Sequence, residues 1–181
     1  MHLDIEAIYI NDSADSYTGL LAKSSWEQAT VYRLSTGSTY WNTASVISLP
    51  KDCAATAPVA LLYLLQAEAR SLEIFADHLE NAFPSTAEFI NAVLAERRFS
   101  NNIGKEVSIE SFWKTFVATM QGMVSQEGFE FTVNAVATPY QELLHKNVIL
   151  HVICFDESWQ EQNYFIETSG HWMLYNWTTG A

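Results

Sequence analysis

The sequence predicts an α+β fold, in which an antiparallel sheet of N-terminal and C-terminal strands carries a central block of about three helices packed on it. Much of 3–49 and most of 129–177 have the patterns of strands, whereas the stretch from residue 57 to Gly128 has helical spacing. Strands, then helices, then strands favour α+β over an alternating α/β arrangement, and we expect the helices to cover one face of the sheet. Because no repeat or linker interrupts the chain, residues 1–181 are most simply one domain.

The N-terminal strands are predicted from alternation and from β-branched residues. Leu3 to Ile10 alternates, Thr30 to Leu34 is β-branched, and Thr39 to Leu49 resumes strand character after the turn formers Ser35 to Ser38. A hairpin between the last two of these strands follows from the turn. Residues 17–27 are ambiguous and could form a short helix, and it stays open whether the early strands join the C-terminal sheet.

Three helices are predicted for the middle of the chain. The first helix begins near Thr56, a possible N-cap that is followed by a proline in the first helical turn. Its apolar stripe extends to Phe83. Ser85 opens the second helix as the N-cap of a capping box. Ser108 caps the third helix, which Gly128 ends.

The C-terminal part is expected to form the centre of the sheet. Residues 129–135 alternate, which predicts a strand with one buried face. Val148 to Phe155 is nearly all apolar, and we expect a central strand covered on both faces. The stretch from Asp156 to Gln162 is polar and acidic, and we expect a loop with Trp159 in its middle.

An aromatic hairpin ends the chain. A two-residue turn at Ser169 and Gly170 would fix its register, because each residue before the turn then faces a defined residue after it. The expected pairs are Thr168 with His171, Glu167 with Trp172, Ile166 with Met173, Phe165 with Leu174, and Tyr164 with Tyr175.

The charge balance limits the classes of partner. Nine Lys and Arg residues against 21 Asp and Glu residues give a net charge of -12. Such a surface repels phosphates, so we expect no nucleic acid and no membrane as partner, and the charge favours a basic protein or a cationic ligand. The same charge could serve solubility alone. The N-terminus lacks the features of a signal peptide, and the longest apolar run, Pro58 to Leu65, is far below the ~20 residues of a membrane span, so a soluble, cytoplasmic protein is expected.

Signatures of catalysis and of metal binding are missing from the sequence. It contains no nucleophile elbow, phosphate loop, dinucleotide-binding glycines or HExxH helix. His151 and Cys154 lie three residues apart on a predicted strand, His151 on the side of Ile149 and Ile153, so the two side chains point to opposite faces. The sequence has two cysteines, Cys53 and Cys154, and this number does not indicate whether a disulfide forms. We expect a protein that is not an enzyme and has no cofactor and no metal site.

Tryptophans and carboxylates are combined in ways that suit a basic partner. They meet in the predicted acidic loop and again in the terminal hairpin, and the first predicted helix carries three acids at spacings of four and three. Tryptophan is enriched at binding hot spots, and surrounding acid steers cations. The plain alternative is a solvated helix face and tryptophans that pack in the core. The candidate partner-binding residues are Glu73, Asp77, Glu80, Asp156, Glu157, Trp159, Glu161, Glu167 and Trp172.

This profile, taken over the whole chain, resembles that of bacterial toxin-immunity proteins, including those of contact-dependent growth inhibition systems. Such proteins are small, cytoplasmic, acidic and rich in aromatic residues, and they lack enzymatic motifs. The resemblance rests on no diagnostic motif and assigns no site residue. It implies a stoichiometric inhibitor of a basic toxin domain, typically a nuclease, whose acids replace the phosphates of the substrate or clamp a surface beside the active site.

Two further interpretations are carried beside this one. Helices on a curved antiparallel sheet can enclose a cone-shaped pocket, as in the nuclear-transport-factor type of fold. Such a pocket could bind a small ligand, or support acid-base chemistry by His151 or His171 with a carboxylate. The third interpretation is a structural protein whose aromatic hairpin forms a homodimer.

Overall fold

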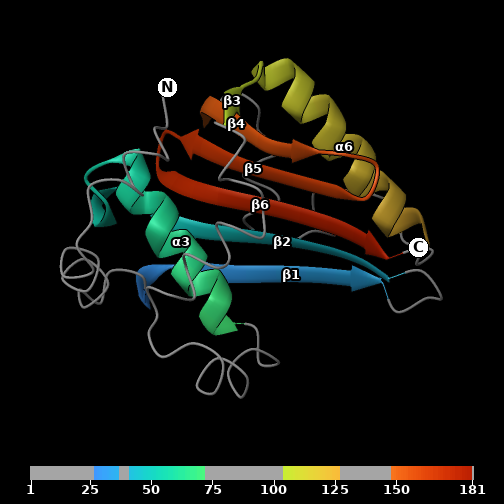
Figure 1. The fold of residues 1–181 in the computed structure, drawn as a ribbon, viewed down its shortest axis with the longest axis horizontal. Coiled ribbons are helices and arrows are strands. Elements are labelled where there is room, and N and C mark those ends of the chain that lie inside the picture. Colours follow the sequence, from blue (N-terminus) through green and yellow to red (C-terminus); the bar gives the residue numbers. More distant parts are fainter. Residues whose placement is uncertain (1–26, 37–40, 72–103, 127–147, 181) are drawn as a thin grey trace.

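Six strands form one antiparallel sheet in a computed structural model that describes residues 27–36, 41–71, 104–126 and 148–180 (Figure 1). The strand order is β1-β2-β6-β5-β4-β3. The elements are β1 (Thr30–Thr36), β2 (Trp41–Pro50), the short helix η2 (Lys51–Cys53), α3 (Ala57–Ser71), β3 (Lys105–Glu106), α6 (Ile109–Gln126), β4 (Ile149–Glu157), β5 (Glu161–Thr168) and β6 (His171–Gly180). β2 pairs with β6 from Trp41 to Pro50, so strands from the two ends of the chain share one sheet.

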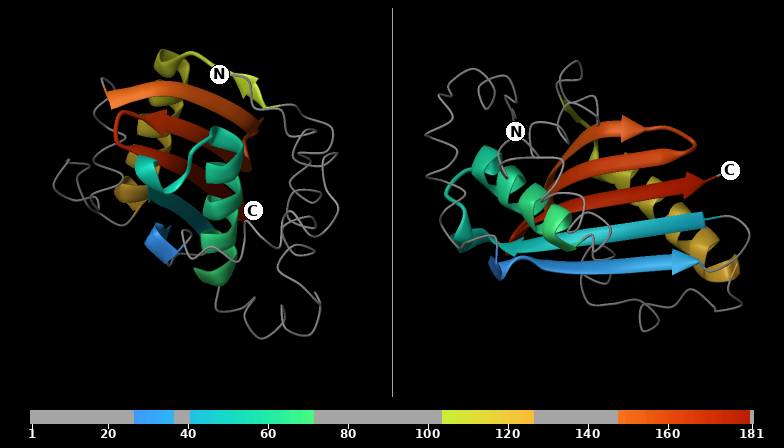
Figure 2. Two further views of the ribbon diagram at one scale, coloured as in Figure 1. Left: turned by 90° about the vertical axis from the view of Figure 1, so that its left-hand side faces the viewer. Right: turned by 60° about the horizontal axis from the view of Figure 1, so that its bottom comes forward.

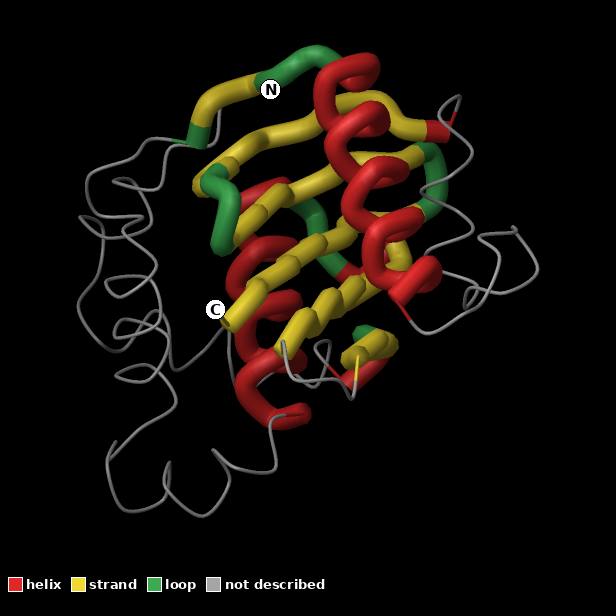
Figure 3. Tube along the Cα trace, turned by 90° about the vertical axis from the view of Figure 1, so that its right-hand side faces the viewer, coloured by secondary structure: helices red, strands yellow, loops and turns green. Residues whose placement is uncertain are grey.

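The two described helices lie on opposite faces of this sheet (Figures 2 and 3). Ile47, Phe165 and Leu174 belong to the core under α3, whereas Tyr164 and Tyr175 belong to the core under α6. The expectation that the helices cover one face is therefore wrong for α3 and α6. The reason is that β2, β5 and β6 carry large apolar side chains on both sides, and burying only one face would leave the other in water.

Helix α3 is enclosed rather than amphipathic. All residues from Ala60 to Glu68 are buried. Leu61 and Leu65 are at most 1% exposed and pack in the core above β2, β5 and β6. A helix that is apolar on nearly all sides is typical of a position inside a protein, where each large aliphatic side chain contributes roughly 1.5–3 kcal/mol on burial.

Helix α6 packs through an aromatic cluster. The Phe112 ring meets Tyr164 edge to face at 5.0 Å, and Phe116 meets Tyr175 in the same way at 5.1 Å. Such pairs add about 0.5–1.5 kcal/mol each to the area they bury. The helix begins where the sequence predicts, because the Ser111 backbone N–H donates to the Ser108 hydroxyl at 3.1 Å.

The predicted hairpins are confirmed. β1 pairs with β2, and β5 pairs with β6 in the expected register, with Tyr164 opposite Tyr175 and Glu167 opposite Trp172. The expected acidic loop is shorter than residues 156–162, because its first two residues end β4 and its last two begin β5. Asp156, Glu157 and Glu161 keep some exposure in these strand ends, whereas Gln162 is buried and its side-chain amide bonds the Thr119 hydroxyl of α6.

Strand β4 is covered on both faces as predicted, since Val152 and Ile153 are fully buried on opposite sides. Cys154 shares the α6 side with Val152. One detail differs from the expectation: Ile149 also lies on the α6 side and not on the side of Ile153. A register shift between Ile149 and His151 explains the change of side.

Several expectations lie outside the described residues. They are the strand at 3–10, the short helix at 17–26, the first helix beyond Ser71, the helix that begins at Ser85, and the strand at 129–135. Within the described ranges, no helix has the length and apolar character needed to cross a membrane.

Candidate functional site

The turn between β4 and β5 presents a tryptophan to solvent. Among the described residues, only Leu150 and Trp159 are large apolar side chains with high exposure, at 45% and 71%. Trp159 lies in the turn, at the end of the sheet where β6 also ends (Figure 1). Asp156, Glu157 and Glu161 lie in the flanking strand ends, and we call these three residues together with Trp159 the anchor tip.

Hydrogen bonds fix the backbone of the anchor tip. The Ser158 N–H donates to the Glu161 carbonyl oxygen at 2.7 Å, and the Glu161 N–H donates to the Ser158 hydroxyl at 3.0 Å. The Thr179 N–H donates to the Gln160 carbonyl oxygen at 2.9 Å, which ties the turn to β6. The backbone that carries Trp159 is therefore fixed in the free protein, so less backbone ordering would be required on binding.

Two carboxylates of the anchor tip are oriented by neutral groups on opposite sides of the sheet. On the α6 side, the Thr115 hydroxyl donates to Glu157 Oε1 at 3.2 Å. On the α3 side, Asn163 Nδ2 donates to Glu161 Oε1 at 2.6 Å, and Asp156 pairs with Asn163 across the strands. In the part of the chain that the structure describes, no lysine or arginine forms an ion pair with these three carboxylates.

A buried polar row supports the α3 side of the anchor tip. Ser45, Asn176 and Asn163 lie next to one another on β2, β6 and β5, and all three are buried. Asn176 Nδ2 donates to Oε1 of Glu68, a buried residue of α3, at 2.6 Å. Asn163, which bonds Glu161, therefore lies beside Asn176, which bonds the helix. Satisfied polar networks of this kind make a region rigid.

The carboxylates also affect groups beneath the turn. The pKa of the Cys154 thiol is raised to about 11, mainly by burial and in addition by the nearby charges of Glu157 and Asp156. Burial likewise raises the pKa of the Tyr164 hydroxyl, with Cys154 and Glu157 adding to the effect. Both groups therefore keep their protons at neutral pH, and Cys154 lacks the thiolate character of a nucleophile.

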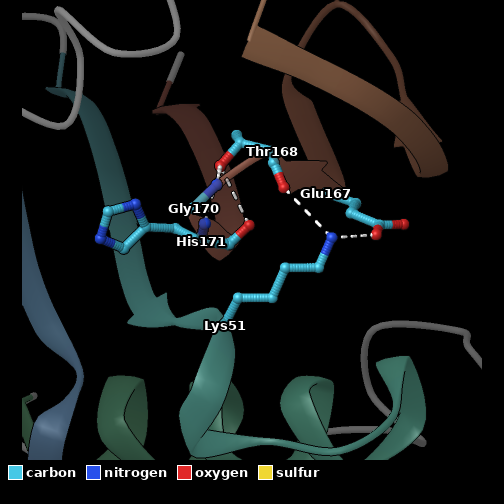
Figure 4. A network of polar contacts seen from close by, with 5 residues as sticks. All are labelled: Lys51, Glu167, Thr168, Gly170 and His171. Atoms are coloured by element: carbon cyan, nitrogen blue, oxygen red, sulfur yellow. Dashed lines mark hydrogen bonds and ion pairs between the residues drawn. The ribbon is translucent and has the colours of Figure 1, made fainter.

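Glu167 of the second hairpin, β5–β6, is paired inside the molecule (Figure 4). Lys51 Nζ forms an ion pair with the Glu167 carboxylate and lies 3.4 Å from the Thr168 carbonyl oxygen. The Lys51 backbone N–H donates to the Gly170 carbonyl oxygen at 3.0 Å. Since the Glu167 side chain is only 14% exposed, its charge is compensated rather than offered to a partner.

Trp172 of the same hairpin is part of the core. It is 6% exposed, and its ring stacks on Phe165 at 5.7 Å. Lys51 Nζ lies over the ring, 5.0 Å from its centroid. A side chain placed in this way has no surface to insert into a partner, so we assign Trp172 to packing.

The remaining candidate residues include three that the structure does not describe. Glu73, Asp77 and Glu80 lie outside the described residues. His151 Nδ1 lies 2.8 Å from Glu106 Oε1 in a pair that is nearly half exposed on both sides, which is worth little in water. No group of three or more His, Cys, Asp and Glu side chains within the described ranges is arranged to hold a metal ion.

Sequence reasoning missed the residues that position these acids. Lys51 and Thr115 each hold a carboxylate by a contact that the chain pattern does not encode. Lys51 is 116 positions from Glu167, and Thr115 is 42 positions from Glu157. Only the alternation of Glu161 and Asn163 along one strand face is a local signal.

Comparison with protein families, curated proteins and solved structures finds no match for this chain.

Proposed function

We propose that this protein is a non-enzymatic inhibitor that binds a basic effector protein, as bacterial immunity proteins bind nuclease-type toxin domains. The observation that carries the proposal is Trp159, 71% exposed on a hydrogen-bonded turn between carboxylates. Binding energy at protein interfaces is concentrated in a few residues, and tryptophan is among the commonest of them. The anchor tip is the binding surface in this proposal, and the protein acts in the bacterial cytoplasm without a cofactor.

The charge of the chain supports the same class of partner. A nuclease-type domain needs a basic surface to hold phosphates, and a protein with net charge -12 is attracted to that surface. Among the described residues, no lysine or arginine forms an ion pair with the three carboxylates of the anchor tip, and their negative charge attracts such a surface. Complementary charge of this kind raises the association rate and makes it fall with added salt.

Co-purification tests the proposal. The tagged protein is expressed with the product of the neighbouring gene and recovered at low and high salt. We expect a basic partner to be retained at low salt, one copy per copy, with its activity blocked. If no neighbour encodes a toxin-like domain and no basic protein is retained at low salt, the proposal is wrong.

A matched pair of variants locates the surface. Trp159→Ala removes the exposed ring of the anchor tip. Leu150→Ala removes the other large apolar side chain that is exposed among the described residues, and it lies at the opposite end of β4. Trp159→Ala should weaken binding by at least ~2 kcal/mol, the usual loss at a hot spot, and Leu150→Ala should leave it unchanged. Equal effects of both variants would place the interface elsewhere.

A further inference from the structure

The chain itself holds a cation between a tryptophan and a carboxylate. In the hairpin β5–β6, Glu167 and Trp172 face each other across the two strands. Lys51 Nζ forms an ion pair with Glu167 and lies 5.0 Å from the centroid of the Trp172 ring. A ring face attracts a cation and a carboxylate binds it, so the two groups act on the same positive charge. A tryptophan and a carboxylate near each other on this sheet can therefore hold one cationic side chain.

Two carboxylates of the anchor tip lie on the same side of the sheet. A register shift between Cys154 and Asp156, as at a β-bulge, leaves Asp156 opposite Asn163 of β5. Asn163 is on the α3 side, because it is two positions from Phe165 of the core under α3. Glu161, two positions before Asn163, shares that side. Asp156 and Glu161 are thus diagonal neighbours on adjacent strands, a separation that one long side chain can bridge.

These two carboxylates have no cation in the part of the chain that the structure describes. The Asp156 carboxylate forms no hydrogen bond or ion pair to a described residue, and Glu161 Oε1 accepts a bond from the neutral amide of Asn163. Both acidic residues keep some exposure. Two like charges this close to each other repel. A cation supplied by a partner would compensate both of them at once.

The other side of the anchor tip is less accessible to a partner. Helix α6 lies there, and its Thr115 hydroxyl donates to Glu157 Oε1 at 3.2 Å. β6 continues beside the turn, since the Thr179 N–H donates to the Gln160 carbonyl oxygen. On the α3 side, the helix crosses the sheet nearer the opposite strand ends (Figures 1 and 2), and Thr178, which faces Glu161, is exposed. A partner therefore meets the end of a broad sheet from the α3 side.

We propose that the anchor tip binds one arginine side chain of the partner from the α3 side. Its guanidinium group lies between the carboxylates of Asp156 and Glu161 and against the ring of Trp159, which is 71% exposed. This inference rests on the proposed function and names the chemical group of the partner that the anchor tip recognises. Glu157, on the α6 side, is outside the contact.

The number of carboxylates favours arginine over lysine. A guanidinium group is planar and has five N–H donors, so it can bond two carboxylates and still stack on an aromatic face. An ammonium group is a compact point charge, and Lys51 pairs with the one carboxylate of Glu167. The anchor tip offers two carboxylates on one side, which matches the larger set of donors.

Neutral variants of the carboxylates test which side is used. The partner recovered by co-purification is bound to the full chain carrying Asp156→Asn or Glu161→Gln. We expect each variant to weaken binding about tenfold or more, with a faster dissociation rate, because each removes a charge from a desolvated contact. Glu157→Gln on the α6 side and Glu167→Gln, whose carboxylate pairs with Lys51, are the controls. Both controls should leave the dissociation rate unchanged.

The ring of Trp159 is tested by two replacements. Trp159→Leu keeps a large apolar side chain but removes the aromatic face, whereas Trp159→Phe keeps a weaker one. A cation on the ring predicts binding about fivefold weaker or more for Trp159→Leu, and a smaller loss for Trp159→Phe. Insertion of the ring into an apolar pocket predicts the opposite order or equal effects.

Chemical modification of the partner identifies the cation. Phenylglyoxal modifies arginine, and reductive methylation modifies lysine while keeping its charge. We expect phenylglyoxal treatment of the partner to abolish binding, and methylation to leave it unchanged. In the complex, mass spectrometry should find one arginine of the partner protected from phenylglyoxal.

The outcomes separate this inference from the proposed function. If Trp159→Ala weakens binding but Asp156→Asn or Glu161→Gln binds normally, or if no arginine is protected, the inference is wrong while the proposed function stands. Loss of binding on methylation alone would assign the contact to lysine and would also overturn the inference. If Trp159→Ala and both carboxylate variants bind normally, the anchor tip is not the interface and both proposals fail.

Discussion

The hairpins β4–β5 and β5–β6 share a strand and the same residue types but differ in what their acids and tryptophans contact. In β5–β6, Glu167 is paired with Lys51 and Trp172 is 6% exposed. In β4–β5, Trp159 is 71% exposed and Glu157 is held by a neutral hydroxyl. The comparison shows that a tryptophan beside a carboxylate is not by itself a binding signal. The two hairpins differ in whether another part of the chain supplies a cation that pairs with the carboxylate and side chains that bury the tryptophan.

Trp172→Ala should give the largest effect that separates the two hairpins. Removing this ring empties space between Phe165 and Lys51, and we expect a loss of ~3–5 kcal/mol in the free energy of unfolding. Trp159→Ala should change that free energy by less than ~0.5 kcal/mol, because its ring is in solvent. Urea denaturation of both variants measures the difference. Equal losses would mean that the turn of β4–β5 is packed as tightly as the core.

Gly104→Ala tests the packing beside β4, the first strand of the β4–β5 hairpin. A Cβ atom at this position would lie 2.3 Å from Ile153 Cγ2 and 2.6 Å from Phe155 Cε1, closer than atoms can approach. We expect a loss of ~1–3 kcal/mol from overpacking. Gly122→Ala on α6 is the control, since nothing lies within 4 Å of its Cβ, and it should stabilise by up to ~1 kcal/mol. Thermal melting of the two variants distinguishes these signs.

Lys51→Met tests the internal compensation of Glu167. The variant keeps an apolar stem near Trp172 but leaves a carboxylate that is 14% exposed without its cation, and we expect a loss of ~1–2 kcal/mol. In the double variant with Glu167→Gln, much of this loss should be recovered. A double-mutant cycle by urea denaturation gives the coupling free energy between Lys51 and Glu167. A value near zero would mean that Lys51 does not compensate Glu167, and the two hairpins would then not differ in this respect.

Alkaline pH should reveal the influence of the anchor tip on Cys154. Its pKa is raised in the folded protein from 9.0 to about 11, so the stability it contributes is fully present below pH 9 and is lost as the pH rises toward about 11. Alkylation of Cys154 should therefore remain slow until the pH approaches 11. Glu157→Gln should shift this profile to lower pH, because it removes one of the charges that oppose the thiolate. Mass spectrometry separates Cys154 from Cys53, and an unchanged profile would contradict the electrostatic effect.

Local pattern predicted most of the described sheet and little of the candidate site. Alternation and turn residues were sufficient for the register in which Tyr164 faces Tyr175, because a two-residue turn fixes every later pair. The same alternation does not indicate which helix covers which face of the sheet. For that reason α3 and α6 were expected on one face. Trp159 and Trp172 have similar neighbours in sequence, and only the tertiary position of Lys51 and Phe165 separates them.

The pairing of β2 with β6 has a consequence for the order in which the sheet forms. Pro50 faces His171 and Trp41 faces Gly180, so the centre of the sheet joins segments made at very different times during synthesis. Ribosomes add 5–20 residues per second, and the early strand waits on the order of ten seconds for its partner. Folds with such distant pairings also form slowly after release. A sheet built in this way is complete only after β6 has joined it, so the turn that carries Trp159 gains its hydrogen bond from Thr179 late in folding.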